Sequence, residues 1–444
     1  MTITVIGAGL AGVEAAGALS KQGFHVKLYE MKPQKRTPAH SYNGFAELVC
    51  SNSLKADSLS SAAGLLKAEM RLLGSLVLEA AEITKVKAGG ALAVDRKAFS
   101  DEITRRIKSD PNIEIIEGEV SCFPKRNAVI ATGPLTSDAF AKEIEQRCMG
   151  LLSFYDAAAP IVTLESIDIN KAFFGNRYGK ASADGTSEAD YLNCPFTEEE
   201  YNIFYNALAE AECAPLHEFD ENSGKRQSLK VYEGCIPVEI LAKRGRDSIR
   251  YGCMKPVGFT DPATGKRPYA IVQLRTENDR NTMFNIVGFQ TNLKFGEQER
   301  VFRLIPGLEN AEFIRYGVMH RNTFLDSPRL LDRRLRLKNS DGIYFAGQIT
   351  GTEGYAESAA GGIIAGLSLA RELKGESPLQ LPETGMISSL CGYVSDASIK
   401  DFQPMGANMG LLPPLDCRVK GKRERYEKLS ERALQDLKTT LALL

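Results

Sequence analysis

The sequence of 444 residues has no apolar run that approaches the roughly 18 residues of a membrane-spanning helix. Its first residues, MTITVIGAGLAG, lack the basic segment, apolar stretch and cleavage site of a secretory signal. These two absences predict a soluble, cytoplasmic protein. The contents of 43% hydrophobic and 25% charged residues are those of a globular chain, and the length allows about two or three domains.

The sequence also lacks any CxxC pair, and its nine cysteines are irregularly spaced. Neither a zinc site nor a disulfide framework is therefore expected, and we predict no metal. Most of the thiols are expected to pack as small apolar side chains.

An excess of basic charge is missing as well, because the net charge is -1. This value does not indicate a nucleic-acid partner, but basic residues gathered on one face would still allow one. Two runs are strongly basic, RLLDRRLRLK (329–338) and CRVKGKRER (417–425). Each fits either a solvated surface or a phosphate-binding surface, and the sequence leaves both interpretations open.

The first thirty residues predict a strand, a glycine turn, a helix and a second strand. The turn is a GxGxxG motif made of Gly7, Ala8, Gly9, Leu10, Ala11 and Gly12. Its glycines allow a tight turn, close approach of the backbone to a pyrophosphate, and packing of helix on strand. Glu30 closes the second strand, where a carboxylate can accept hydrogen bonds from both ribose hydroxyls. We therefore predict dinucleotide binding without a 2′-phosphate.

Two later segments favour FAD over NAD and S-adenosylmethionine. NAVIATGPLT (127–136), with Gly133, resembles the strand and turn that pass the cofactor in flavoproteins. DGIYFAGQITGTEGYAESAAGGIIAG (341–366) resembles their second flavin segment, with a helix that begins near the flavin. The expected cofactor contacts here are Gly347, Gln348, Thr350, Gly354 and Tyr355. No second GxGxxG follows, so we expect NAD(P)H to visit the flavin without a domain of its own.

The flavin segments lie at both ends of the sequence, which predicts an α/β fold with a discontinuous domain. We expect a Rossmann-like FAD-binding domain made of residues 1–152 and 320–444. Residues 153–319 are expected to form an inserted α+β domain that contributes to substrate binding. Helices are predicted at TEEEYNIFYNALAEAE (197–212) in the insertion and at the closing segment from residue 423.

Two cysteines occupy unusual positions. Cys50 lies in ELVCSNSLKAD, where a helix opening at SNSLKAD and the nearby Lys55 would favour a thiolate. Cys235 lies between Gly234 and Pro237 and is therefore expected at a turn, with basic residues following it.

The motifs FAGQITGTEGYAESAAGG, ELVCSNSLK, YEGCIPVE, YGCMKPVG, VMHRNTF and FQPMGANMGLLP all occur in this chain. With them the sequence resembles the folate- and FAD-dependent tRNA (uracil-5-)-methyltransferases (TrmFO). This family is a short branch related to the glucose-inhibited-division (GidA/MnmG-like) flavoproteins that modify wobble uridines. The resemblance covers essentially the whole chain, with Gln348 where wider flavin families carry an acid. The C-terminal helical domain of the longer relatives is not expected here.

The resemblance implies an enzyme that forms 5-methyluridine in the tRNA T-loop (m5U54). Uracil C5 is a poor nucleophile, so a thiolate adds to C6 and activates C5 toward a one-carbon unit. Methylenetetrahydrofolate would supply the carbon, and reduced FAD, restored by NAD(P)H, would supply the hydride. The family assigns the nucleophile and the acid/base to Cys50 and Cys235. The sequence does not decide between the two roles, and we favour Cys235 as the nucleophile.

Further contacts with folate and RNA follow from the resemblance. His320, Arg321 and Asn322 are candidates for hydrogen bonds to folate. Tyr355 is a candidate for stacking on the pterin or flavin, and Asn408 for a loop near folate or RNA. Because the sequence has no tryptophan, tyrosine, phenylalanine or arginine would have to stack on the extracted base.

Three other functions remain open. The first is the same chemistry on a uridine of 23S rRNA, which the sequence does not distinguish from tRNA methylation. The second is a flavin oxidoreductase that acts on a small metabolite and turns over without RNA. The third is a non-catalytic flavin-containing RNA-binding scaffold, which would tolerate serine at both cysteines. The sequence also leaves the oligomeric state and the choice between NADH and NADPH undecided.

Overall fold

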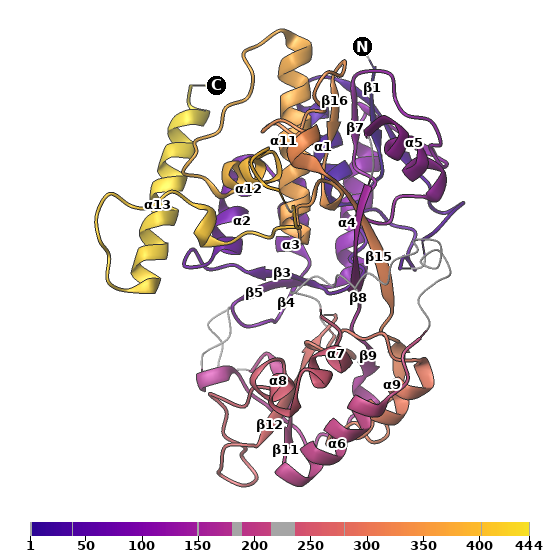
Figure 1. The fold of residues 1–444 in the computed structure, drawn as a ribbon, viewed down its shortest axis with the longest axis vertical. Coiled ribbons are helices and arrows are strands. Elements are labelled where there is room, and N and C mark those ends of the chain that lie inside the picture. The colour runs from indigo at the N-terminus through magenta and orange to yellow at the C-terminus, as the bar shows by residue number, and fades with distance from the viewer. Residues whose placement is uncertain are drawn as a thin grey trace.

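The computed structural model describes residues 2–37, 39–148, 151–179, 189–214, 236–278, 280–400 and 402–443. These residues form two lobes connected by a narrow pair of strands (Figure 1). Both ends of the chain lie in the upper lobe. The upper lobe thus brings together segments from the two ends of the sequence.

A five-stranded parallel sheet forms the centre of the upper lobe, in the order β16-β7-β1-β2-β6. Its strands are β1 (Thr2–Ile6), β2 (His25–Glu30), β6 (Ile113–Glu117), β7 (Ala128–Ile130) and β16 (Ile343–Phe345). Both faces of the sheet are covered, since Ile3, Val5 and all three residues of β7 are fully buried. This arrangement confirms the predicted α/β, Rossmann-like class.

Helices α1 (Leu10–Lys21) and α11 (Tyr355–Lys374) pack closely against each other in this lobe. A Cβ at Gly362 would lie 2.1 Å from the carbonyl oxygen of Ala11, so the contact requires glycine. The other helices are α2 (Ala62–Leu72), α3 (Leu76–Ile83), α4 (Arg96–Ser109), α5 (Asp138–Cys148), α10 (Ser327–Leu330), α12 (Met386–Val394) and α13 (Lys422–Leu441). Helix α13 confirms the helix predicted for the closing segment.

The lower lobe contains a six-stranded antiparallel sheet in the order β10-β11-β12-β13-β9-β14. Its strands are β9 (Ile161–Thr163), β10 (Phe173–Phe174), β11 (Tyr191–Phe196), β12 (Ala270–Thr276), β13 (Met283–Ile286) and β14 (Phe313–Arg315). Its helices are α6 (Glu198–Glu210), α7 (Val238–Lys243), α8 (Arg246–Tyr251) and α9 (Phe295–Phe302). Helix α6 confirms the prediction from TEEEYNIFYNALAEAE, and Thr197 with Glu200 forms a capping box at its start.

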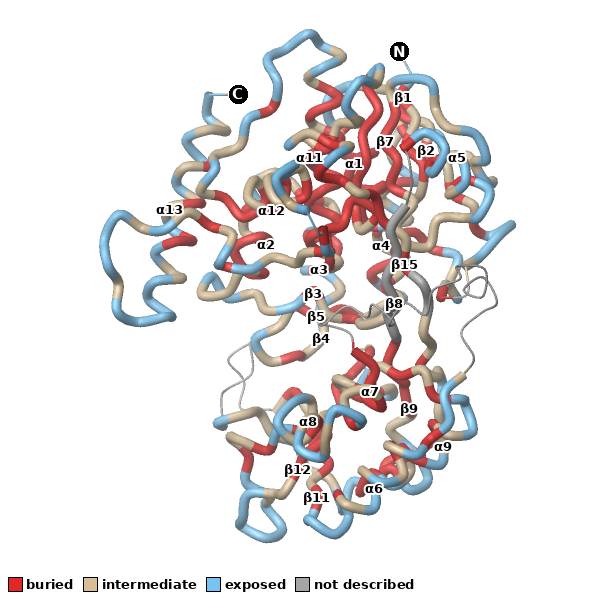
Figure 2. Tube along the Cα trace, in the orientation of Figure 1, coloured by how far each residue is buried: buried red, intermediate tan, exposed pale blue. Residues whose placement is uncertain are grey.

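Strands β8 (Leu151–Ala157) and β15 (Met319–Leu325) pair antiparallel and connect the lobes. One hydrophobic core draws on residues 3–148 and 324–433, and the other on residues 162–311. Figure 2 shows the buried residues gathered inside each lobe. The boundaries expected after residues 152 and 319 fall within these connecting strands, and the domain limits stay a prediction.

A small three-stranded sheet lies at the base of the upper lobe and faces the lower lobe (Figure 1). Its order is β3 (Ser53–Ala56), β5 (Ala91–Val94), β4 (Lys85–Val86). Strand β3 shows that the helix expected directly after Cys50 was wrong. The buried ammonium of Lys67 donates to the carbonyls of Leu54 (2.8 Å) and Ala56 (2.7 Å). These long-range bonds, together with the pairing to β5, hold the segment extended.

Candidate active site

A cavity of about 490 Å³ lies at the carboxyl ends of the five parallel strands. The segments that follow the strands line it: Gly7–Ala11, Glu30–Lys32, Gly118–Val120, Ala131–Ser137 and Gly347–Gln348. In open parallel sheets this edge is the usual place for a ligand. Gln290 adds a wall from the lower lobe, so both lobes contribute to the cavity.

The glycine turn forms one end of the cavity. Gly7 has a φ of +98°, and a Cβ at Gly12 would lie 1.7 Å from the carbonyl oxygen of Gly7. Gly9 is the N-cap of α1, and a Cβ there would meet no protein atom within 4 Å. The first turn of α1 carries no acidic side chain, so its N–H groups and dipole are uncompensated. This end of the cavity is therefore suited to an anion.

Glu30 lies in the cavity wall beside this turn and is almost fully buried. Its carboxylate accepts hydrogen bonds from the N–H groups of Ala8 (3.0 Å) and Lys32 (2.9 Å). These bonds hold the glycine turn against the end of β2. The role of Glu30 toward a ribose stays a prediction.

Glycines also shape the opposite side of the cavity. Gly133, Gly347 and Gly354 all line it, with φ of +69°, +84° and +126°. Gly354 is the N-cap of α11, which confirms the helix start expected near that residue. Because only glycine adopts such backbone conformations readily, the main chain can lie close to a ligand here.

Gln348 and Thr350, both expected to contact the cofactor, differ in position. Gln348 lines the cavity, and its amide nitrogen donates to both carboxylate oxygens of Glu353 (2.9 and 2.7 Å). Thr350 is fully buried, does not line the cavity, and donates its hydroxyl to the carbonyl of Gly347 (2.8 Å). The hydroxyl of Thr350 thus closes the turn after β16, and a contact of this residue with the cofactor stays a prediction.

The residues expected to contact folate lie on β15. Asn322 is fully buried and lines the cavity. Neither its amide oxygen nor its amide nitrogen has a hydrogen-bond partner in the described part of the chain. Buried amides are rarely left unpaired, so Asn322 is suited to a ligand with both a donor and an acceptor. His320 and Arg321 belong to the same strand, but their side chains lie outside the described residues.

Asn408 is exposed and does not line the cavity. Its side-chain oxygen accepts the N–H of Gly410 (3.1 Å) and caps the short 3₁₀ helix Met409–Leu411. The N–H of Ala407 donates to Glu357 (3.1 Å) in the first turn of α11. The loop thus packs near the cavity, but the side chain expected to contact folate or RNA has a capping role.

Cys50 reaches the cavity from the loop before β3 and is half-buried. Its N–H donates to the hydroxyl oxygen of Tyr355 (2.8 Å), and its Sγ lies 2.9 Å from the same oxygen. The N–H of Ser51 also donates to that oxygen (3.3 Å). Burial raises the pKa of Tyr355 well above its usual value, so the phenol stays protonated. The hydroxyl hydrogen is therefore available to the sulfur. Cys235, the second expected thiol, lies outside the described residues.

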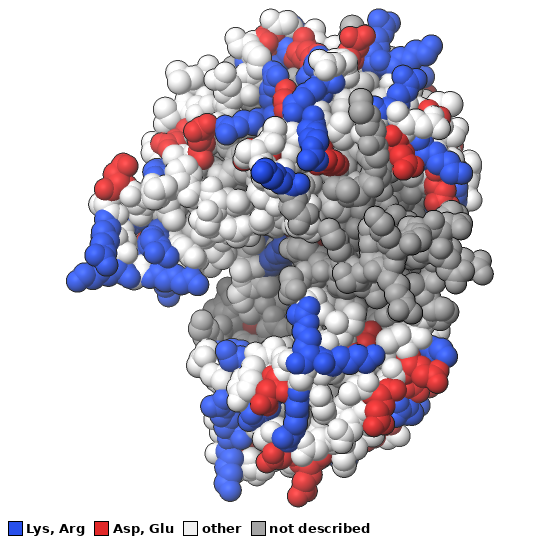
Figure 3. Space-filling view, viewed as in Figure 1, with Lys and Arg blue, Asp and Glu red and all other residues white. Residues whose placement is uncertain are grey.

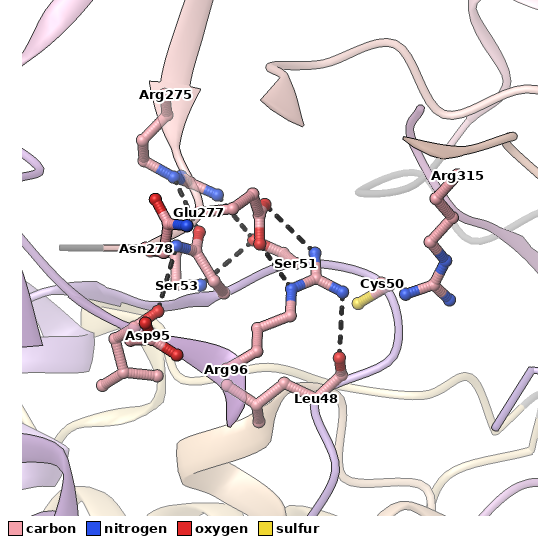
Figure 4. Close-up of polar contacts among 12 residues, drawn as sticks. Leu48, Cys50, Ser51, Ser53, Asp95, Arg96, Arg275, Glu277, Asn278 and Arg315 are labelled. Atoms are coloured by element: carbon pink, nitrogen blue, oxygen red, sulfur yellow. Dashed lines mark hydrogen bonds and ion pairs between the residues drawn. The ribbon is translucent and has the colours of Figure 1, made fainter. Parts of the chain in front are cut away.

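Arg96, which sequence reasoning missed, supports the loop that carries Cys50 (Figure 4). Its guanidinium donates to the carbonyls of Leu48 (3.0 Å) and Val49 (3.3 Å). It also forms a two-point ion pair with Glu277 (2.6 and 3.2 Å). Burial acts to lower the pKa of Arg96, but the charge of Glu277, together with Tyr355, the hydrogen bonds to Glu277, and Cys50, raises it overall.

Two further arginines reach this loop from the lower lobe. Arg275 on β12 donates to the side chains of Asn52 (3.0 Å) and Ser51 (2.8 Å). Arg315, the last residue of β14, lies beside Cys50 (Figure 4). Burial, and then the charge of Arg96, lower the pKa of Arg315. Neither arginine belongs to a recognisable sequence motif. Only their contacts with the Cys50 loop in the folded protein identify them as residues of the site.

Lys55, the cation that the sequence places near Cys50, lines the same cavity and forms an ion pair within it. Its ammonium donates to the carboxylate of Glu357 (2.8 Å) and to the carbonyl of Glu353 (3.4 Å). Glu357 is almost fully buried and compensates the charge of Lys55. Arg96 and Arg315 are further cations that interact with Cys50.

The two basic runs differ in their partners. In the run 329–338 the ion pairs are Arg329–Asp326, Arg333–Glu383, Arg334–Asp332 and Arg336–Glu372. In the run 417–425, by contrast, Arg418, Lys420 and Lys422 form no ion pair with any described residue. Figure 3 shows Lys and Arg side chains at the tip of the upper lobe where α13 begins, and on the lower lobe across from it. The second run is therefore better suited to phosphate groups.

In the described segments, no group of three His, Cys, Asp or Glu side chains is placed to hold a metal ion. No helix there combines the length and the apolar character that crossing a bilayer requires.

The chain matches a known protein family and relatives of high sequence identity. The family described as glucose inhibited division protein A matches residues 2–377. The methylenetetrahydrofolate–tRNA-(uracil-5-)-methyltransferase TrmFO of Acetivibrio thermocellus is 55% identical over 438 residues, 98% of each chain. The protein of that name from Bacillus pumilus is 52% identical over 438 residues, also 98% of each chain.

The fold is also similar to a solved structure. Aquifex aeolicus GidA superposes with a TM-score of 0.70 at 17% identity, covering 100% of this chain and 73% of that chain. At this identity the similarity shows the fold alone.

Proposed function

The chain belongs to the TrmFO branch of the glucose inhibited division protein A family, and we propose that it methylates tRNA with folate and FAD. The product is 5-methyluridine in the T-loop, with methylenetetrahydrofolate as carbon donor and NAD(P)H as reductant. The observation that carries the proposal is the position of Cys50. Its thiol lies in the wall of the cavity that the glycine turn closes at the other end.

The residues of the cavity fit FAD. The glycine turn and the uncompensated N-terminus of α1 suit a pyrophosphate, and Gly9 and Gly133 leave free space where a Cβ would lie. The amide of Asn322 offers an unpaired donor and acceptor for the polar edge of a ring. Further contacts would come from the backbone and side chains of Ala8, Leu10, Ala11, Glu30, Gly347, Gln348 and Gly354. When bound, FAD supplies the hydride that completes the methyl group.

Cys50 and Cys235 provide the nucleophile and the acid/base. In the cavity the phenol of Tyr355 donates to the sulfur of Cys50 and orients it. For Cys235, support comes from the residues that follow it. The N–H of Val238 donates to the carbonyl of Gln290 (2.7 Å), and Gln290 lines the cavity. We retain Cys235 as the nucleophile that adds to uracil C6 and Cys50 as the group that moves the C5 proton.

The substrates follow from the same surfaces. His320, Arg321 and Asn322 on β15 are proposed to contact folate. The unpaired cations of the run 417–425 are proposed to bind tRNA phosphates, at a site of action in the cytoplasm.

The experiment that tests this function supplies purified FAD-loaded protein with NADH, methylenetetrahydrofolate labelled in its methylene carbon, and unmodified tRNA. We expect label in 5-methyluridine of the T-loop. A 23S rRNA fragment, offered in parallel, should stay unlabelled. Unlabelled tRNA from a protein whose flavin is reduced normally by NADH would reject the proposal. Label in the rRNA fragment alone would show that 23S rRNA, and not tRNA, is the substrate.

A further inference from the structure

We propose that Arg315 is the electrostatic partner of a Cys50 thiolate, and that Arg96, locked by Glu277, is the positioning residue that holds the sulfur beside it. The inference rests on the proposed function in treating Cys50 as a reactive thiol. The ionisation of that thiol, however, can be measured without RNA or folate.

Arg96 holds the loop before Cys50 in place, because all three guanidinium nitrogens donate hydrogen bonds to protein groups. Two of its nitrogens bind the carboxylate of Glu277, and the third donates to the carbonyls of Leu48 and Val49. These two residues directly precede Cys50, so the position of Arg96 determines where the sulfur lies. The side chain of Glu277 is 2% exposed, and a buried charge of this kind is costly when its partner is removed. The lower lobe therefore fixes a loop of the upper lobe.

Arg315 differs from Arg96 in having little to neutralise it. Its hydrogen bond in the structure is a long one, to the carbonyl of Ala39 (3.4 Å). No carboxylate in the described part of the chain forms an ion pair with it. In Figure 4 the sulfur of Cys50 lies between the guanidinium groups of Arg96 and Arg315, and both groups interact electrostatically with it. A thiolate would supply the counter-charge that Arg315 lacks.

Among the described residues, Arg96 from α4, Arg315 from β14 and Tyr355 from α11 interact electrostatically with Cys50. Arg275 and Glu277, from β12 and its end, contact the neighbouring loop residues and Arg96, and Glu47 and Lys55, from the segment of Cys50 itself, line the same cavity. Most of them already have partners in the protein. Glu277 binds Arg96, Lys55 binds Glu357, and Arg275 donates to neutral side chains of the loop. Arg275 and Arg315 are thus the cations near this loop that form no ion pair with a described carboxylate, and Arg315 is the one that lies beside the sulfur.

Ionisation of Cys50 breaks its S–H bond, and the proton passes to water. The negative charge stays on the sulfur, where the Tyr355 hydroxyl donates a hydrogen bond to it. No electron transfer and no other bond change is involved.

The test measures how fast iodoacetamide alkylates Cys50 in the FAD-loaded protein from about pH 5.5 to 9.5, with peptide mass spectrometry to separate this thiol from the others. Arg315→Ala should raise the midpoint of the rate profile by about one pH unit and slow alkylation at pH 7 about tenfold. Arg315→Lys keeps the charge and should stay near the wild-type midpoint. Arg333→Ala removes a surface arginine that is paired with Glu383, and should change nothing.

The plateau of the alkylation rate at high pH distinguishes reagent access from thiol ionisation. A change in the access of iodoacetamide to Cys50 alters the plateau rate but leaves the pH midpoint unchanged. A wild-type midpoint in Arg315→Ala that retains its FAD overturns the partnership. Should that variant lose FAD, Arg315→Gln is scored by the same criterion. Absence of methyl transfer would reject the proposed function and leave this measurement valid.

Arg96 is tested by Arg96→Lys, which keeps the charge and loses the planar fork. We expect an alkylation midpoint near the wild-type value but a kcat for methyl transfer at least tenfold lower, with an unchanged KM for folate. Glu277→Gln should give the same pattern, because Arg96 then lacks its ionic anchor. Full kcat in both variants would overturn the positioning role. A loss of FAD content in parallel with kcat would do so as well, because it would indicate a merely structural role.

Discussion

The hydroxyl oxygen of Tyr355 lies 2.8 Å from the backbone nitrogen of Cys50 and 2.9 Å from its sulfur. One phenol at the start of α11 therefore fixes both the main chain and the thiol of a residue 305 positions away. Because the oxygen already accepts N–H groups, its hydrogen is directed at the sulfur. This contact is the local reason that the thiol faces the cavity.

Removal of that hydroxyl should impair the chemistry more than the fold. Tyr355→Phe keeps the ring but leaves the N–H of Cys50 without its acceptor, at a cost on the order of 1–3 kcal/mol. We expect methyl transfer in single turnover to fall at least tenfold while bound FAD is retained. Tyr344→Phe, which removes a phenol bonded to Glu372, serves as the control and should keep its transfer rate. Equal rates in Tyr355→Phe and the wild type would contradict this role.

A methyl group at Gly9 should block the cofactor without disturbing the fold. The φ of Gly9 is −73°, which alanine adopts readily, and its Cβ would meet no protein atom within 4 Å. We expect Gly9→Ala to keep the thermal midpoint of the apoprotein and to raise the Kd for FAD at least tenfold, about 1.4 kcal/mol. Gly296→Ala in α9 also meets no atom and is the matched control, with unchanged FAD affinity. Unchanged affinity in Gly9→Ala would place the pyrophosphate elsewhere.

The unpaired cations of the run 417–425 should account for part of the salt dependence of tRNA binding. Arg418→Ala/Lys420→Ala removes two exposed cations that have no ion pair with a described residue. Two lost phosphate contacts should lower the slope of log K against log salt by about 1.5. Arg333→Ala/Arg334→Ala changes the net charge equally but removes cations paired with Glu383 and Asp332. We expect it to leave the slope unchanged in filter binding across salt concentrations, and equal slopes for both double variants would refute the assignment.

Stability should decline with rising pH because of Glu69. Burial raises the pKa of this carboxyl from 4.5 to about 7, although the N–H groups of Met386 and Ile387 donate to it. The folded state thus holds a proton that the unfolded state releases near pH 4.5. The stabilisation is full below that pH and is lost as pH rises through 7, with a size on the order of 3 kcal/mol.

Thermal midpoints at pH 5 and pH 8 check this expectation. Glu69→Gln resembles the protonated form, so the difference between the two midpoints should shrink. The exposed Glu145 on α5 offers the control Glu145→Gln, which should keep the wild-type difference. A difference that Glu69→Gln leaves intact would assign the pH dependence to other groups, such as Glu14, whose pKa burial also raises to about 7.

The sequence by itself determined the features that depend on local backbone geometry. The glycine turn, the acid that closes β2 and the start of α11 at Gly354 were all predictable, because each depends on conformations of a few neighbouring residues. The glycine motif and the two flavin-like segments similarly indicated the α/β class, and periodicity indicated helices α6 and α13. The family motifs also pointed to Cys50.

Only the tertiary structure decided which charges act at the site. Arg96 and Glu277 are 181 residues apart, and no sequence pattern around either residue predicts that they form an ion pair. The same reason explains three further features. Pairing of β3 with β5 replaced the helix expected after Cys50. Glu357 forms an ion pair with Lys55. Carboxylates such as Glu383 pair with the arginines of the basic run 329–338. Coulombic and hydrogen-bond partners act over a few ångströms in space, and folding alone determines which distant residues come that close.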